Sequence, residues 1–117
     1  MKTQQEIFDQ VWTGLKSQGF KRSVEQYNGD CMYRSYYNEK CAIGWLIPDD
    51  KYDIDMEHEH ISYLFENFDL KDIIDFGDGA FLLQLQMIHD RCDEPNSMEL
   101  KYRQFAVKYD LTIPEGN

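Results

Sequence analysis

The segment Cys41–Asp49 constrains the fold most, because it is the one long apolar run in the chain. It reads Cys-Ala-Ile-Gly-Trp-Leu-Ile and stops at Pro48 and Asp49. An apolar run bounded by a turn signal is typical of a buried segment, so this one marks where the core is anchored. It carries no obvious reactive group. At 117 residues the chain has the length of one domain, and we expect residues 1–117 to fold as a single unit.

Apolar residues at helical spacing predict about four helices around this segment. Thr3 and Glu6 form a capping-box pattern at the start of the first helix, and Gly19 is placed to end it. Ser97 is the expected N-cap of the last helix. The expected helices cover about residues 4–18, 56–67, 80–92 and 98–109.

Strand-favouring residues on both sides of Asn38 predict a β-hairpin, with strands near residues 30–36 and 40–45. Gly44 lies inside the second expected strand, where a glycine indicates a bulge or a close approach of a helix. The expected fold class is therefore α+β: a mostly helical domain with about four helices packed around one β-hairpin.

The charge distribution is lopsided. The formal net charge is -10, and residues 49–78 hold eleven acidic residues and two lysines. Binding to a nucleic-acid backbone needs clustered lysine and arginine, so we expect no direct nucleic-acid binding. An anionic membrane surface is disfavoured for the same reason. We expect no membrane span and no secretion signal in the first residues, and hence a cytoplasmic protein.

Three cysteines, Cys31, Cys41 and Cys92, make an odd count without a CxxC pair. This pattern predicts free thiols in a reducing compartment rather than a disulfide framework. A disulfide between Cys31 and Cys41 across the expected hairpin is the less favoured alternative. Cys41 begins the apolar run, so we interpret it as a packed small hydrophobe rather than a nucleophile.

His58 and His60 stand among carboxylates, and this combination can bind zinc or a similar ion. Histidines two positions apart point to opposite sides of a helix, although they share one face of a strand. The segment is neither an HExxH motif nor a calcium loop. We therefore predict no metal ligand, no cofactor and no catalytic residue, and favour a protein that is not an enzyme. A metal-dependent hydrolase using His58 and His60 stays open as an alternative.

The aromatic residues around the expected hairpin indicate a contact surface. Tyrosine and arginine dominate interface hot spots, and an acidic face steers a basic partner into contact. We therefore predict a non-enzymatic binding protein whose partner is a protein with a basic surface, and self-association stays open. The predicted binding residues are Arg34, Tyr36, Tyr37, Asp49, Asp50, Asp53, Asp55 and Glu57.

A small-molecule binder of the nucleotide type is the alternative reading of the same aromatic residues. In that case Tyr33, Arg34 and Trp45 would line a pocket, because aromatic and arginine planes stack on bases.

Two blocks of the sequence resemble a family of small uncharacterised proteins from bacteriophages and bacterial genomes. The first runs Cys31-x-Tyr33-Arg34 and then Lys40-Cys41-Ala42-Ile43-Gly44-x-Leu46-Ile47-Pro48-Asp49-x-x-Tyr52; the second is Leu82-x-x-Leu85-Gln86-x-Ile88-His89-Asp90. This chain departs from the family in its tyrosine-rich tip and at His58, where the family tends to have glycine. The resemblance implies no activity. It implies a phage context, in which small acidic proteins act on host or defence-system proteins.

Overall fold

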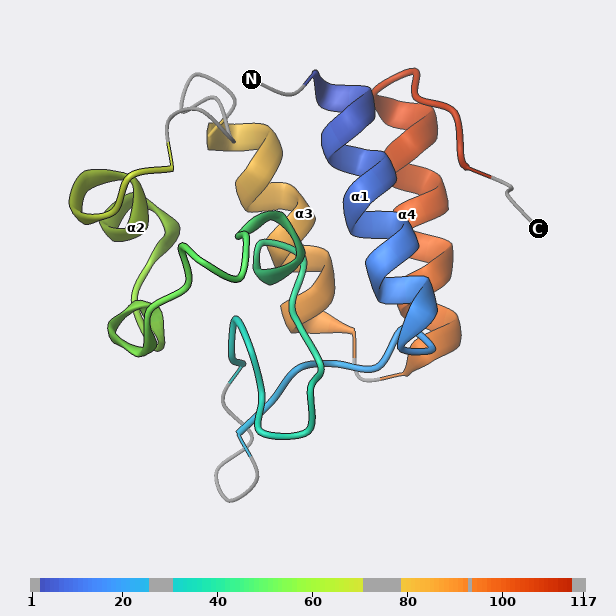
Figure 1. The fold of residues 1–117 in the computed structure, drawn as a ribbon. Helices are drawn as coiled ribbons and strands as arrows, with labels where there is room; N and C mark the ends of the chain where they lie inside the picture. Colours follow the sequence, from blue (N-terminus) through green and yellow to red (C-terminus); the bar gives the residue numbers. More distant parts are fainter. Residues whose placement is uncertain (1–2, 26–30, 71–78, 93, 115–117) are drawn as a thin grey trace.

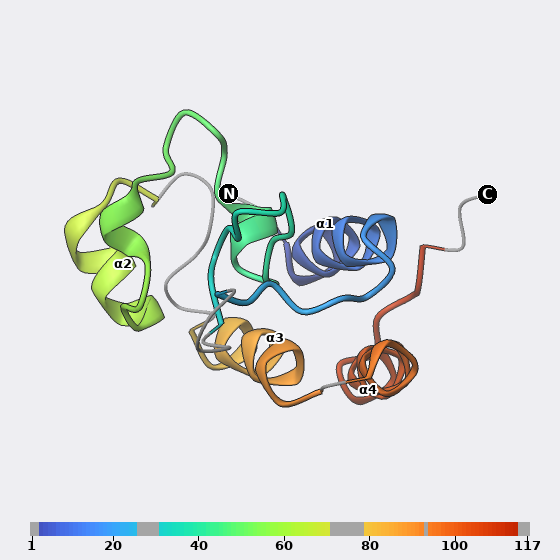
Figure 2. The same ribbon diagram turned by 90° about the horizontal axis from the view of Figure 1, so that it is seen from below.

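The computed structural model describes residues 3–25, 31–70, 79–92 and 94–114. Helices α1, α3 and α4 lie together, and α2 stands on the far side of α3 from α4 (Figures 1 and 2). Helices α3 and α4 run in opposite directions (Figure 1). No helix in the described part of the chain is long and apolar enough to cross a bilayer. The elements are α1 (Gln4–Ser17), η1 (Gly44–Leu46), η2 (Ile54–Met56), α2 (Ile61–Asn67), α3 (Gly79–Arg91) and α4 (Pro95–Lys108).

The start and the end of α1 confirm the sequence prediction. The Thr3 side chain accepts from the Glu6 amide, and the Glu6 carboxylate accepts from the Thr3 amide, so the capping box is complete. Gly19 follows the helix with a φ of 71°, a left-handed conformation that suits glycine. One face of α1 is buried from Ile7 to Leu15 and supplies a large part of the core.

The predicted β-hairpin is wrong, and with it the α+β fold class. Residues 3–25, 31–70, 79–92 and 94–114 contain no strand, only two isolated antiparallel bridges, Val24 with Cys31 and Arg34 with Lys40. The pairing beside the second bridge ends where the Cys41 amide donates to the Tyr33 carbonyl, because the chain then turns into η1. The N–H and C=O of Lys40 point away from Arg34 and bond the Gln18 side chain instead.

The apolar run forms a helical turn rather than a strand. The Trp45 amide donates to the Cys41 carbonyl, and the Leu46 amide donates to the Ile43 carbonyl, so the chain closes on itself at η1. Gly44 is needed here because a Cβ at this position would lie 2.0 Å from the Tyr33 carbonyl oxygen. The expected close approach at Gly44 therefore exists, but its partner is loop backbone, not a helix, and there is no bulge.

The segment around η1 is wedged between α1 and α3 (Figure 2). The Gln10 side chain of α1 donates to the Trp45 carbonyl at 2.6 Å, and the Ile43 amide donates to Gln86 of α3 at 3.0 Å. These two hydrogen bonds satisfy the Trp45 carbonyl and the Ile43 amide, which have no partner strand to bond to among the described residues. The prediction that this run anchors the core is confirmed: Cys41, Ala42, Ile43, Leu46 and Ile47 are all buried.

Two other helix boundaries differ from the expectation. Helix α2 begins only at Ile61, after the separate turn η2, and its N-cap is His60. Helix α4 begins at Pro95 rather than after Ser97, because proline is suited to the first helical position. Aromatic rings join α4 to α1 and to α3: Phe105 of α4 lies 6.1 Å from Phe8 of α1 and 5.1 Å from Phe81 of α3, centroid to centroid.

Candidate functional site

Tyr36 and Tyr37 project into solvent, with 72% and 60% of their surface exposed. They sit in the tight loop from Ser35 to Glu39, which the Ser35 amide closes by donating to the Glu39 carbonyl at 2.9 Å. The Ser35 hydroxyl also accepts from the amides of Tyr37 and Glu39, each at 3.2 Å. Two exposed rings on a loop braced in this way lose little conformational freedom when they contact a partner.

Arg34 lies at the base of this loop and is mostly enclosed. Its guanidinium donates to the Ile47 carbonyl at 2.8 Å, pairs with the Asp49 carboxylate at 2.8 Å and lies 4.7 Å from the centre of the Tyr52 ring. Only 18% of the Arg34 side chain is exposed. Arg34 therefore connects the loop Ser35–Glu39, here called the tyrosine loop, to Asp49, the first residue of the acidic segment 49–78. Its guanidinium supports the loop from below and exposes little surface to a partner.

The predicted acidic residues divide into exposed and internal groups. Asp49, Asp50, Asp53 and Asp55 are exposed, although Asp49 also lies 3.8 Å from Lys40, and the Asp53 side chain caps η2 by accepting from the Asp55 amide. Lys51 pairs with Asp69 at 3.5 Å. Of the other aspartates between residues 49 and 78, Asp72, Asp75 and Asp78 lie outside the described residues.

Glu57 is internal: only 8% of it is exposed. Its carboxylate accepts from the amides of Tyr33 and Arg34 at 2.8 and 3.0 Å and from the Tyr52 hydroxyl. Burial, reinforced by the hydrogen bond to Glu57, raises the pKa of Tyr52, so this hydroxyl stays a donor. Glu57 thus holds the base of the tyrosine loop from inside and does not contribute to a contact surface.

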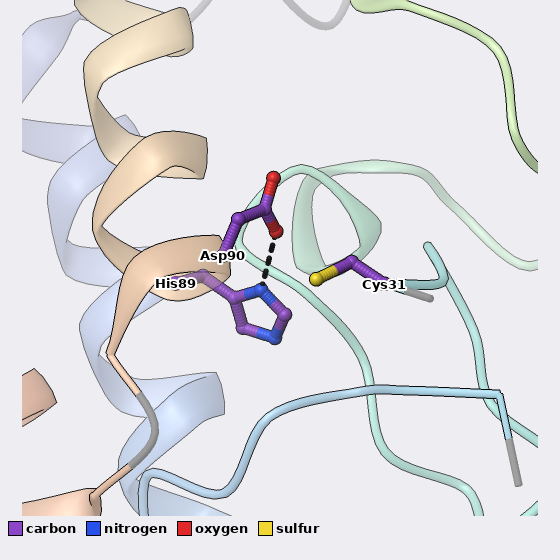
Figure 3. Close-up of side chains that lie close together, drawn as sticks. All are labelled: Cys31, His89 and Asp90. Atoms are coloured by element: carbon purple, nitrogen blue, oxygen red, sulfur yellow. Dashed lines mark hydrogen bonds and ion pairs between the residues drawn. The ribbon is translucent and has the colours of Figure 1, made fainter. Parts of the chain in front are cut away.

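A second cluster joins Cys31, His89 and Asp90, whose sulfur, ring nitrogen and carboxylate oxygen lie within 4.8 Å of one another (Figure 3). His89 is fully buried. Its Nε2 accepts from the Ser23 amide at 2.9 Å, so this nitrogen carries no proton, and Nδ1 donates its proton to Asp90 at 2.9 Å.

This arrangement does not make Cys31 a nucleophile. The basic nitrogen of His89 faces the Ser23 amide, so His89 cannot take a proton from the thiol. Burial alone would raise the pKa of Asp90, but hydrogen bonds from His89, Cys31 and Gln86 outweigh it and hold the pKa below its usual value. A carboxylate held in this way is a weak base, and its negative charge opposes formation of a thiolate.

Cys31 and Asp90 line a cavity of about 560 Å³, and His58, Glu59 and His60 line the same cavity. His58 has a φ of 67°, which is uncommon for a residue with a side chain. The Nδ1 of His60 accepts from the Ser62 amide at 3.2 Å, which leaves Nε2 for other partners. The two histidines that the sequence singled out therefore share one cavity with a thiol and a carboxylate from distant parts of the chain.

The residues of the nucleotide alternative divide between different cavities. Tyr33 lines the cavity at Cys31, Trp45 lines a separate groove over α1, and Arg34 lines neither of these two. Trp45 instead lies under the Lys40 ammonium, 4.5 Å away. The expectation of free thiols is confirmed for all three cysteines.

Comparison with family models, with curated proteins and with solved structures finds no match for this chain. The resemblance to small phage and bacterial proteins therefore stays a prediction. Sequence reasoning missed the internal role of Glu57 and the cluster at Cys31. The one signal for the cluster was the spacing of Gln86 and Asp90, which are four apart and bond side chain to side chain at 2.8 Å.

Proposed function

We propose that this protein is a non-enzymatic binding protein that contacts a protein partner with a basic surface. The contact surface consists of the rings of Tyr36 and Tyr37 and the exposed carboxylates of Asp49, Asp50, Asp53 and Asp55. Following the resemblance, the protein is phage-encoded, works in the cytoplasm of the host cell and acts on a host or defence-system protein.

The ion pair between Arg34 and Asp49 carries this proposal. It ties an exposed carboxylate, 86% of whose side chain is accessible, to the base of the loop that presents Tyr36 and Tyr37. The ion pair therefore places one exposed carboxylate, that of Asp49, at the base of the loop that carries both aromatic rings. Rings of this kind supply the buried anchors of an interface, while the surrounding charge speeds encounter and selects the partner.

Charge reversal tests the acidic part of the surface. Asp50→Lys and Asp55→Lys each replace an exposed carboxylate without removing a hydrogen bond that the structure assigns to that side chain. Glu94→Lys makes the same charge change at an exposed position before α4 and serves as the control. We expect the first two variants to weaken partner binding and flatten its salt dependence, and the control to do neither. Equal binding by all three variants would refute the acidic contact surface.

A second candidate, the metal-dependent hydrolase, is favoured by the cavity that His58 and His60 share with Cys31 and Asp90. His89 does not fit as a ligand, since both of its ring nitrogens are already engaged. Cys31 and Asp90 would supply a thiolate and a carboxylate, and His58 or His60 would have to move to join them, because the one group of three possible ligands within 4.8 Å among the described residues is Cys31, His89 and Asp90. Addition of Zn²⁺ should then raise the melting temperature of the wild type but not of Cys31→Ser. No shift in the wild type would exclude zinc binding here.

A further inference from the structure

A groove of about 450 Å³ lies between α3 and α4, and it differs in character from the proposed acidic surface. Met87, Ile88, Cys92 and Phe105 make its floor apolar. Grooves of this size between helices are common binding sites.

Three cations stand along the groove, although the whole chain has a net charge of -10. Arg91, Lys101 and Lys108 line it, and no carboxylate of the described residues does. Neither Arg91 nor Lys101 pairs with a carboxylate in the described part of the chain. The occupant that complements this groove is therefore anionic and partly apolar.

The cations are spread along the groove rather than gathered at one point. The Lys108 ammonium bonds to Gln84 of α3 at 3.1 Å, which places it at one end. Arg91 lies seven residues further along α3, about 10 Å away at the rise of an α-helix. A ligand with a single carboxylate would meet one end only. A helix with acidic residues one to two turns apart would meet both.

Apolar surface continues beyond the groove along α4. Leu100 and Val107 are 54% and 82% exposed, and both share a helical stripe with Gln104, which lines the groove. Two exposed aliphatic side chains about two helical turns apart favour an elongated partner over a compact one. An amphipathic helix laid in a groove has this shape.

We infer that the α3–α4 groove binds an acidic amphipathic helix of a protein partner. Its apolar face would cover Met87, Ile88 and Phe105, and its flanking carboxylates would meet Arg91, Lys101 and Lys108. This site is separate from the surface of Tyr36 and Tyr37 and does not depend on the function proposed for that surface.

The test uses three probes and amide chemical shifts of the full chain. One is an 18-residue peptide with leucines at helical spacing and glutamates on both flanks, the second carries lysine at each glutamate, and the third is dodecanoate. The double variant Lys101→Glu with Lys108→Glu, here called the rim variant, reverses the charge of two of the three cations that line the groove. Lys16→Glu with Lys21→Glu makes the same change in net charge at exposed positions outside the groove and is the matched control.

We expect the acidic peptide to shift amides of α3 and α4, the lysine peptide to bind far more weakly, and the rim variant to lose roughly tenfold or more in affinity. The control and Tyr36→Ala with Tyr37→Ala should bind the acidic peptide as the wild type does. Equal binding of the two peptides, no shifts with the acidic peptide at millimolar concentration, or binding of dodecanoate alone would overturn the inference.

Discussion

The guanidinium of Arg34 and the carboxylate of Asp49 lie 2.8 Å apart and join two segments that the sequence separates by the whole apolar run. Arg34 is mostly enclosed and Asp49 is exposed, so the ion pair adds little to the free energy of unfolding. Its main effect is to fix where the two segments lie. It sets the start of the acidic segment beside the base of the tyrosine loop. The sequence had predicted both features but gave no reason for them to be neighbours.

Glu57 is predicted to stabilise the fold. Glu57→Gln keeps the shape of the side chain but turns an acceptor into a donor among the amides of Tyr33 and Arg34 and the Tyr52 hydroxyl. We expect the free energy of unfolding to fall by about 1–3 kcal/mol in denaturant titrations. Glu59→Gln, at the exposed neighbour two positions on, should change it by less than about 0.5 kcal/mol. Equal values for the two variants would contradict the internal role of Glu57.

Gly44 should not tolerate even a methyl group. Alanine would place Cβ 2.0 Å from the Tyr33 carbonyl oxygen, so backbone must move, and we expect a loss of roughly 1–3 kcal/mol or more. Gly79→Ala is the matched control, because nothing lies within 4 Å of a Cβ there and α3 begins at this residue. Its melting temperature should stay constant or rise, since alanine favours helix. A neutral Gly44→Ala would refute the packing of η1 against the loop.

Asp90 should make stability depend on acid pH. Its pKa in the folded protein is below the ordinary value of 3.8, so the unfolded chain takes up its proton first as the pH falls. The stabilisation is therefore complete at neutral pH and is lost progressively below about pH 5, down through the lowered pKa. Asp90→Asn should lower the unfolding free energy at pH 7 and reduce its slope between pH 5 and the acid limit. An unchanged slope would show that Asp90 is not held as a carboxylate.

The three thiols should differ in reactivity. All three cysteines line cavities, but Cys41 and Cys92 are buried, and burial raises the pKa of Cys41, whereas Cys31 is partly exposed. A thiol reagent should modify one cysteine in the native protein and all three in denaturant. Cys31→Ser should abolish the native reaction. Native modification of two or more thiols would contradict the burial of Cys41 and Cys92.

Much of the helical architecture follows from local chemistry. The capping box at Thr3, the stop at Gly19 and the apolar stripe of α1 are all local signals, and the structure confirms them. The start of α4 at Pro95 is also a local signal, but the serine two residues later competes for the N-cap. Periodicity predicted one helix over residues 56–67. In the structure this stretch contains the end of η2 and His58 with its positive φ, and α2 begins only at Ile61.

The hairpin could not be excluded from the sequence. Cys31 to Tyr36 and Cys41 to Trp45 are rich in strand formers, but strand propensity reports burial on a pleated surface as much as backbone preference. Here Gly44 lets the apolar run coil against Tyr33, and Gln18, 22 residues before Lys40, bonds the backbone groups of Lys40 on the side away from Arg34. Both effects are long-range, as is the meeting of Cys31 with Asp90.

The account rests on the claim that Tyr36 and Tyr37 anchor a partner beside the acidic segment. Because both rings are exposed, Tyr36→Ala with Tyr37→Ala should leave the melting temperature nearly unchanged. The most direct measurement is a pull-down from infected cells with the wild type and this variant, eluted by a salt gradient. We predict a protein with a basic surface that the wild type retains, that salt releases and that the variant does not capture. Identical proteins on both baits, or no salt-released protein on the wild type, would contradict the claim.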